Sequence, residues 1–145
     1  MLRVVVASSA AVLALAGCAP TEPSPGDWRT TADQALEDTV SEVESVALVL
    51  DLQAHDRLPG RAARIAAVEA EESLATAEES LTTQQPPAGE AGTDRRLGDL
   101  LTEASDQVRQ ARIALTAGDD AAYADLRGRL LDLSDELDAA REDLR

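Results

Sequence analysis

His55 is the only histidine of the chain, and Asp51 precedes it by four residues, so the two side chains share one face of a helix. Such a pair could ligate a metal or exchange a proton. A di-iron bundle needs Glu-x-x-His motifs on two helices, and a zinc protease needs His-Glu-x-x-His; neither pattern occurs in the sequence. We therefore expect an exposed polar pair at this position, with no metal and no cofactor.

Nucleophilic and phosphate chemistry have as little support. The sequence contains no Gly-x-Ser-x-Gly elbow and no Gly-rich phosphate loop. Carboxylates are numerous, but acids on helix faces are usually solvated. We expect a protein that is not an enzyme.

Cys18 is the only cysteine, so no disulfide can form within the chain. It ends a segment that begins with Arg3 and continues as an apolar run of about 13 residues from Val4 to Ala16. A positive start, a short apolar stretch and small residues before a cleavage point are typical of an export signal. The run is shorter than the roughly 20 residues of a membrane-spanning helix.

The tetrapeptide Leu15-Ala16-Gly17-Cys18 resembles the lipobox of bacterial lipoprotein precursors, in which Leu and two small residues precede an invariant Cys. The resemblance implies that the Cys18 sulfur takes a diacylglyceryl group and that cleavage makes Cys18 the mature N-terminus. The alternative is ordinary secretion, with cleavage after Ala16 and a free thiol at Cys18. Lipidation is favoured because it accounts for a lone cysteine in an exported chain.

The formal net charge is −15, and it becomes −16 once the signal, which carries Arg3 and no acid, is removed. This charge argues against a nucleic-acid partner, which requires a basic surface. Every basic residue other than His55 is Arg, which suggests a GC-rich genome. In layout, the mature part resembles small helical lipoproteins of high-GC Gram-positive bacteria, a resemblance that implies no activity. We expect the protein on the outer leaflet of the cell membrane, lipid-anchored and facing outside the cytoplasm.

Apolar residues recur at spacings of three and four, which predicts helices over about residues 30–58, 61–82, 94–117 and 121–144. Pro59-Gly60 and Gly118 separate neighbouring helices, and Thr93 is expected to cap the third. We predict an all-α, up-down-up-down four-helix bundle. The domains are a signal peptide (1–17), a lipidated Pro-rich tether (18–27) and a bundle domain (28–145).

Each helix has an apolar stripe that should face the core. In the first, the stripe is Leu36, Val40, Val43, Ala47, Leu50, Ala54 and Leu58. In the second, it is Ala63, Ala67, Ala70, Leu74, Ala77 and Leu81. In the third and fourth, it is Leu97, Leu101, Ala104, Val108, Ala111 and Leu115, then Tyr123, Leu126, Leu130, Leu133, Leu137, Ala140 and Leu144.

Several apolar residues of the first two helices fall off these stripes: Leu48, Val49, Leu52, Ile65 and Val68. Leu48, Leu52, Ile65 and Val68 are the candidate partner-binding residues, because a contiguous exposed apolar surface usually marks an interface. The alternative is that a helix flanked by two others buries more than one seam, which would place these residues in the core.

We therefore expect a non-catalytic interaction or scaffold module at the cell envelope, anchored to the membrane through Cys18. Its partner would be a protein or a second copy of the chain. The alternative function is a small-ligand or cation-binding lipoprotein beside a transporter or envelope system. The acids of the first helix could form a weak cation-binding face or pair with Arg95, Arg96, Arg109 or Arg112.

Overall fold

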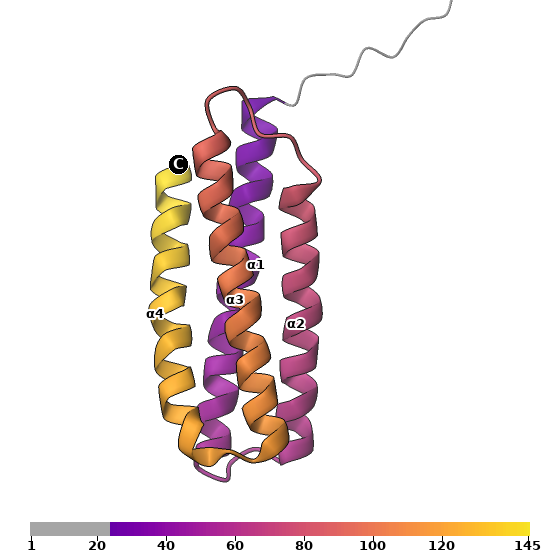
Figure 1. Ribbon diagram of the computed structural model, residues 1–145, viewed down its shortest axis with the longest axis vertical. Coiled ribbons are helices and arrows are strands. Elements are labelled where there is room, and N and C mark those ends of the chain that lie inside the picture. The colour runs from indigo at the N-terminus through magenta and orange to yellow at the C-terminus, as the bar shows by residue number, and fades with distance from the viewer. Residues whose placement is uncertain (1–23) are drawn as a thin grey trace, which may run out of the picture.

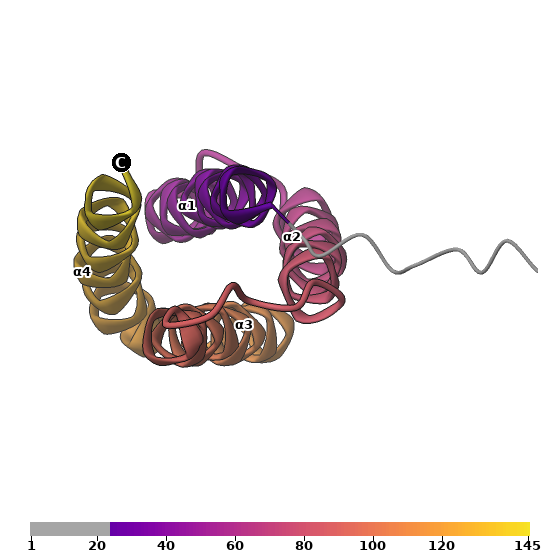
Figure 2. The same ribbon diagram turned by 90° about the horizontal axis from the view of Figure 1, so that it is seen from above.

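The computed structural model describes residues 24–145, which form four antiparallel helices (Figure 1). These are α1 (Pro25–Ala54), α2 (Gly60–Thr82), α3 (Ala91–Ala117) and α4 (Asp120–Leu144). Seen end-on, the helices follow one another around the bundle, so α1 lies between α2 and α4 (Figure 2). The predicted all-α, up-down-up-down four-helix bundle is confirmed. The predictions for residues 1–23, including Cys18 and the signal peptide, concern residues outside those that the structure describes.

Helix α1 begins at Pro25, five residues before the predicted start near residue 30. Ser24 is the N-cap, and its Oγ accepts a hydrogen bond from the backbone N–H of Asp27 at 3.2 Å. Pro25 occupies the first turn, where a missing N–H is not needed, and Asp27 places a negative charge near the positive end of the helix dipole. The last three residues of the predicted tether, 25–27, therefore belong to α1.

Helix α1 also ends earlier than expected, at Ala54 rather than Leu58. Asp56 adopts a φ of 52°, the left-handed conformation that commonly terminates a helix. The backbone N–H groups of Asp56 and Arg57 then donate to the carbonyls of Gln53 and Leu52 at 3.1 and 2.8 Å, which is the pattern of a Schellman motif. Asp is one of the few residues other than Gly that tolerates this conformation, so Asp56 and not Pro59-Gly60 stops the helix.

The other two connections differ in length. Residues 83–90 join α2 to α3. Helix α3 starts at Ala91, and its N-cap residue is Glu90. Thr93 lies inside the first turn, so the prediction that Thr93 caps this helix is wrong. Between α3 and α4, Gly118 adopts a φ of 67° and ends α3 as predicted. This tight turn holds α3 and α4 side by side.

The core confirms the predicted stripes of α2, α3 and α4, whose members are all buried. Helix α1 buries more than its predicted stripe, because it packs on α2 and α4 and also reaches α3 across the bundle. Its additional buried residues are Trp28, Ala32, Ala35, Thr39, Val46 and Val49. Val49, which lies off the predicted stripe, is therefore buried, as the alternative of a second buried seam on this helix predicts. Ala54, predicted to be core, is exposed beside the early helix end.

The N-terminal end of α1, the 83–90 connection and the C-terminus lie at one end of the bundle (Figure 1). The turns after α1 and α3 lie at the opposite end. None of the four helices is both long enough and apolar enough to cross a membrane. We call the end that holds the start of α1 the N-terminal end of the bundle.

Candidate functional site

A groove of about 670 Å³ lies between α1 and α2. It lies in the half of the bundle that contains the start of α1, and it is open to solvent. Six of its ten lining residues carry a hydroxyl group, and none is basic. The ten lining residues are Thr30, Thr31, Gln34, Asp38, Ser41, Glu42, Ser73, Thr76, Ala77 and Ser80. The groove is therefore rich in oxygen atoms, with two carboxylates.

Several of these polar groups already have partners inside their own helix. Gln34 Nε2 donates to Asp38 Oδ1 at 2.9 Å, and the hydroxyls of Thr76 and Ser80 donate to backbone carbonyls one turn earlier. At the N-terminal end of the bundle, Gln84 Nε2, in the 83–90 connection, donates to Thr31 Oγ1 in α1 at 2.8 Å. A hydroxyl that donates its only proton in this way keeps lone pairs that can accept from a ligand.

The groove follows the one seam between neighbouring helices that no ion pair crosses within residues 24–145. Arg112 on α3 pairs with Glu71 on α2 at 2.7 Å, and Arg96 on α3 pairs with Asp143 on α4 at 2.8 Å. The seam between α4 and α1 has ion pairs from Arg127, Arg141 and Arg145. The acids of α1 thus pair with α4, and not with Arg95, Arg96, Arg109 or Arg112 as considered from the sequence, because α3 lies diagonally across the bundle from α1.

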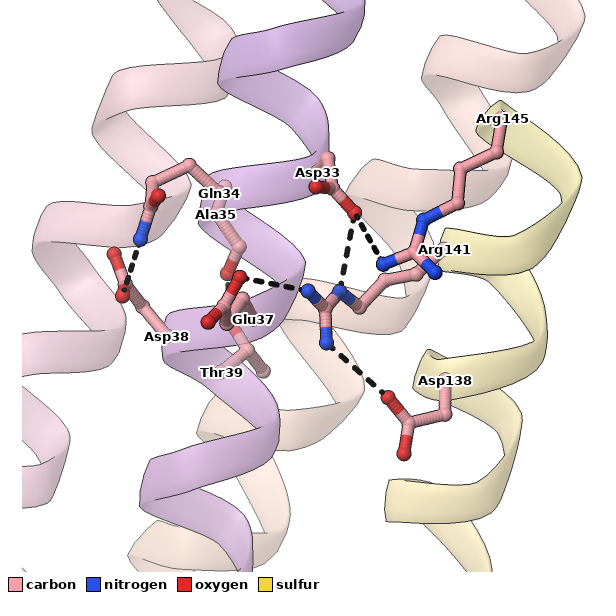
Figure 3. Close-up of polar contacts among 9 residues, drawn as sticks. All are labelled: Asp33, Gln34, Ala35, Glu37, Asp38, Thr39, Asp138, Arg141 and Arg145. Carbon is pink, nitrogen blue, oxygen red and sulfur yellow. Dashed lines mark hydrogen bonds and ion pairs between the residues drawn. The ribbon is translucent and has the colours of Figure 1, made fainter.

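The densest charge cluster surrounds Arg141, whose side chain is only 15% exposed. Its guanidinium donates to Asp33 at 3.2 Å, to Glu37 at 2.7 Å and to Asp138 at 3.4 Å (Figure 3). Burial works to lower the pKa of Arg141, but the hydrogen bonds and charges of Asp33, Glu37 and Asp138 outweigh burial and raise its pKa. This cluster is satisfied internally, so it serves to hold α4 against α1.

The four candidate partner-binding residues have unequal exposure. Leu48, Ile65 and Val68 are 58%, 47% and 42% exposed, whereas Leu52 is half-buried. Exposed large apolar side chains also occur on the other two helices, at Ile113 and Leu131. Apolar exposure is therefore spread around the bundle and is not confined to the α1–α2 hairpin.

His55 lies beyond the last turn of α1 and is exposed. Its Nδ1 lies 2.7 Å from the backbone carbonyl oxygen of Asp51, while the Asp51 carboxylate faces Arg127 at 3.6 Å. The two side chains are thus turned to different partners. In the portion of the chain from residue 24 onward, no three His, Cys, Asp or Glu side chains gather in a way that could hold a metal ion.

No protein family, curated protein or solved structure matches the chain.

The sequence reasoning missed the groove, although its polar residues leave a signal. Ser73, Thr76 and Ser80 recur at spacings of three and four along α2, beside the buried stripe. On α1 the same spacing links Thr31, Gln34, Asp38 and Ser41. Two such polar stripes predict a polar seam only when the two helices are known to be adjacent and in register, which the sequence alone does not establish.

Proposed function

We propose that the protein is a lipid-anchored, non-catalytic binding module of the cell envelope that presents the outer face of α1 and α2 to a partner. The lipobox supports the anchor, and the α1–α2 groove carries the proposal of a binding face. The groove lies on the seam without ion pairs, and Leu48 and Ile65 leave apolar surface farther along the same two helices. Catalysis is not proposed, because the sole histidine is exposed at a helix end and faces a backbone carbonyl.

The alternative is a lipoprotein that binds a cation or a small polar ligand. The groove is the specific observation in its favour, since Asp38 and Glu42 are one turn apart on α1 and are surrounded by hydroxyl oxygens. Hard cations prefer such oxygen ligands but require more of them than two carboxylates provide. The binding-module proposal is therefore preferred.

The proposal is tested on intact cells with a photo-crosslinking side chain at Ser45, an exposed position on the outer side of α1. We expect a discrete protein adduct from position 45 and none from the matched exposed position Glu136 on α4. The Cys18→Ser chain should leave the membrane fraction or stall as a precursor, and it should lose the adduct. Identical adducts from positions 45 and 136, or a Cys18→Ser chain that fractionates like the wild type, would contradict the proposal.

A further inference from the structure

The α1–α2 groove differs in charge from every other seam of the bundle. Helix α1 has no Arg after Arg29, and α2 has none after Arg64, so no basic side chain borders the groove. Figure 3 shows that Asp38 points away from Arg141, the residue to which Asp33 and Glu37 are bonded. Asp38 has only the neutral amide of Gln34 as a hydrogen-bond partner among the described residues. No cation of residues 24–145 therefore neutralises the negative charge of Asp38 and Glu42.

We propose that this groove binds an extended basic segment of a partner protein, with Arg or Lys side chains of that segment at Asp38 and Glu42. This inference rests on the proposed function and names the chemistry of its partner. A guanidinium or ammonium group matches the two carboxylates, and its hydrogen bonds to an ionised acceptor are stronger than those between neutral groups.

The dimensions of the groove favour an extended chain. Its lining on α1 runs from Thr30 to Glu42, which at 1.5 Å per helical residue is about 18 Å. An extended peptide rises about 3.3 Å per residue, so five or six residues span this length. The hydroxyls of Thr30, Thr76 and Ser80 donate to backbone carbonyls of their own helices, so they can only accept hydrogen bonds from a peptide. The hydroxyls of Thr31, Ser41 and Ser73 donate to no group among the described residues, so they can both donate to C=O groups and accept from N–H groups of a peptide backbone.

Other occupants fit less well. A tightly held metal needs more ligands than the groove brings together, and no three-ligand group occurs in residues 24–145. A carbohydrate would favour an aromatic platform, but Trp28 and Tyr123, the only aromatic residues of the chain, are both buried. A second copy of this acidic chain would bring like charges together.

The inference is tested by fluorescence anisotropy with the mature lipidated protein in zwitterionic micelles at physiological salt. The probe is a labelled hexapeptide in which three Arg residues alternate with Ser, and the control probe has Glu in place of Arg. The variant Asp38→Asn with Glu42→Gln should weaken binding of the Arg probe about tenfold, as expected for two partly exposed ion pairs. Asp38→Asn leaves an oxygen that still accepts from Gln34, so the fold should be unaffected.

The matched control is Asp132→Asn with Glu136→Gln on α4. Asp132 and Glu136 are also one turn apart, and their substitution gives the same change in net charge. Both are exposed, whereas in the groove pair Asp38 is exposed and Glu42 is half-buried. It should weaken binding less than twofold. Thr76→Arg, which places a cation inside the groove, should weaken binding as much as the groove double variant does. Circular dichroism on each variant verifies that the helices are retained.

An equal loss of probe binding in both double variants would show that the probe responds only to the net charge of the protein, and this result would overturn the inference. Displacement of the Arg probe by spermine or Ca²⁺ at equal concentration would also overturn it, because the site would then recognise cations and not a peptide. If the groove double variant still forms the cross-link from position 45 on cells, the groove assignment is wrong while the proposed binding function stands. Loss of that cross-link together with loss of probe binding supports both.

Discussion

Arg141, near the end of α4, donates from Nε to a carboxylate oxygen of Asp33 in α1 at 3.2 Å. Consecutive helices of the bundle are joined by connections, but α4 and α1 are joined by none. Side chains alone therefore hold α4 against α1. Apolar residues of both helices pack in the core, and Arg141 adds an ion pair to Glu37 (Figure 3). The first and last helices are thus fastened near the N-terminal end of the bundle.

Replacing Arg141 with Met, which keeps the apolar stem, should lower the free energy of unfolding by about 1–2 kcal/mol, because three carboxylates lose their common cation. Arg96→Met is the matched control, since both partners of the Arg96–Asp143 pair are more than half exposed. It should cost no more than about 0.5 kcal/mol. Urea unfolding at low and high salt measures both values. A cost for Arg141→Met that does not decrease at high salt would argue against an electrostatic role.

Leu50 and Leu48 provide a test of the core that needs no knowledge of function. Leu50 is fully buried, and Leu48, two residues earlier on α1, is 58% exposed. Leu50→Ala should destabilise the bundle by about 2–5 kcal/mol through a cavity, and Leu48→Ala by less than about 0.5 kcal/mol. Chemical unfolding followed by circular dichroism measures the difference. Equal costs would mean that the face of α1 turned to the core is assigned wrongly.

The agreement between sequence and structure is best where a helix has a narrow apolar stripe. Helix α2 contacts α1 and α3 alone, and its six predicted residues from Ala63 to Leu81 are the six that the structure buries. Helix α1 contacts three helices, so a second stripe through Trp28, Ala35 and Val46 is buried as well. Periodicity detects a stripe but does not reveal how many neighbours a helix has.

The candidate site was less predictable for a related reason. The exposure of Leu48 and Ile65 follows from helical periodicity, but the groove depends on which residues of α1 lie opposite Ser73 and Thr76. That register is set by where α1 ends, and the end is fixed by the backbone conformation of Asp56. The Pro59-Gly60 pair is the stronger stop signal in the sequence, so the earlier stop was missed.

Tyr123 allows burial to be measured at a single residue, at the end of the bundle opposite the N-terminal end. Burial raises the pKa of its phenol, and the neighbouring carboxylates of Asp120 and Asp119 raise the pKa further. As the only tyrosine, it can be titrated by the ultraviolet absorbance of tyrosinate. We expect a midpoint above 10 in the folded protein and about 10 in urea. Asp120→Asn should lower the titration midpoint of Tyr123 in the folded protein only partly, because burial is the largest single cause of the raised pKa.

The sign of the linked stability change follows from the same shift. Below about pH 10 the phenol is neutral in both states, so its contribution to stability is constant. As the pH rises further, the unfolded chain loses its proton first, and the free energy of unfolding falls until the folded state also ionises. Tyr123→Phe should remove this part of the alkaline loss. An equal alkaline loss in the Phe variant would contradict the raised pKa.

The orientation of the bundle on the membrane follows from the proposed anchor. The start of α1, the 83–90 connection and the C-terminus share one end, so this end should lie next to the lipid (Figure 1). Ala88 and Arg61 are exposed positions that bracket α2, whose 23 residues span about 34 Å. Spin labels are attached to Cys in the variants Ala88→Cys and Arg61→Cys. A paramagnetic lipid headgroup should relax the label at position 88 strongly and the label at position 61 weakly. Equal relaxation at the two positions would rule out an upright bundle.

The exposed apolar residues of the α1–α2 hairpin give the last prediction. Leu48, Ile65 and Val68 are solvent-exposed in the bundle, so replacing all three with Ser should leave the melting temperature nearly unchanged. If these residues form part of the partner surface, the triple variant should lose the cross-link from position 45, because burying their apolar area on binding is favourable at about 25 cal/mol per Å². Leu52 is left intact, since it is half-buried and its loss would disturb packing.

The matched control replaces Ile113 and Leu131, the exposed apolar residues of α3 and α4, with Ser. This variant removes apolar surface of the same kind from the two helices that do not form the proposed binding face. The cross-link from position 45 should therefore persist in it. A cross-link that persists in the triple variant, or disappears equally in both variants, would show that the α1–α2 apolar residues have no specific part in binding.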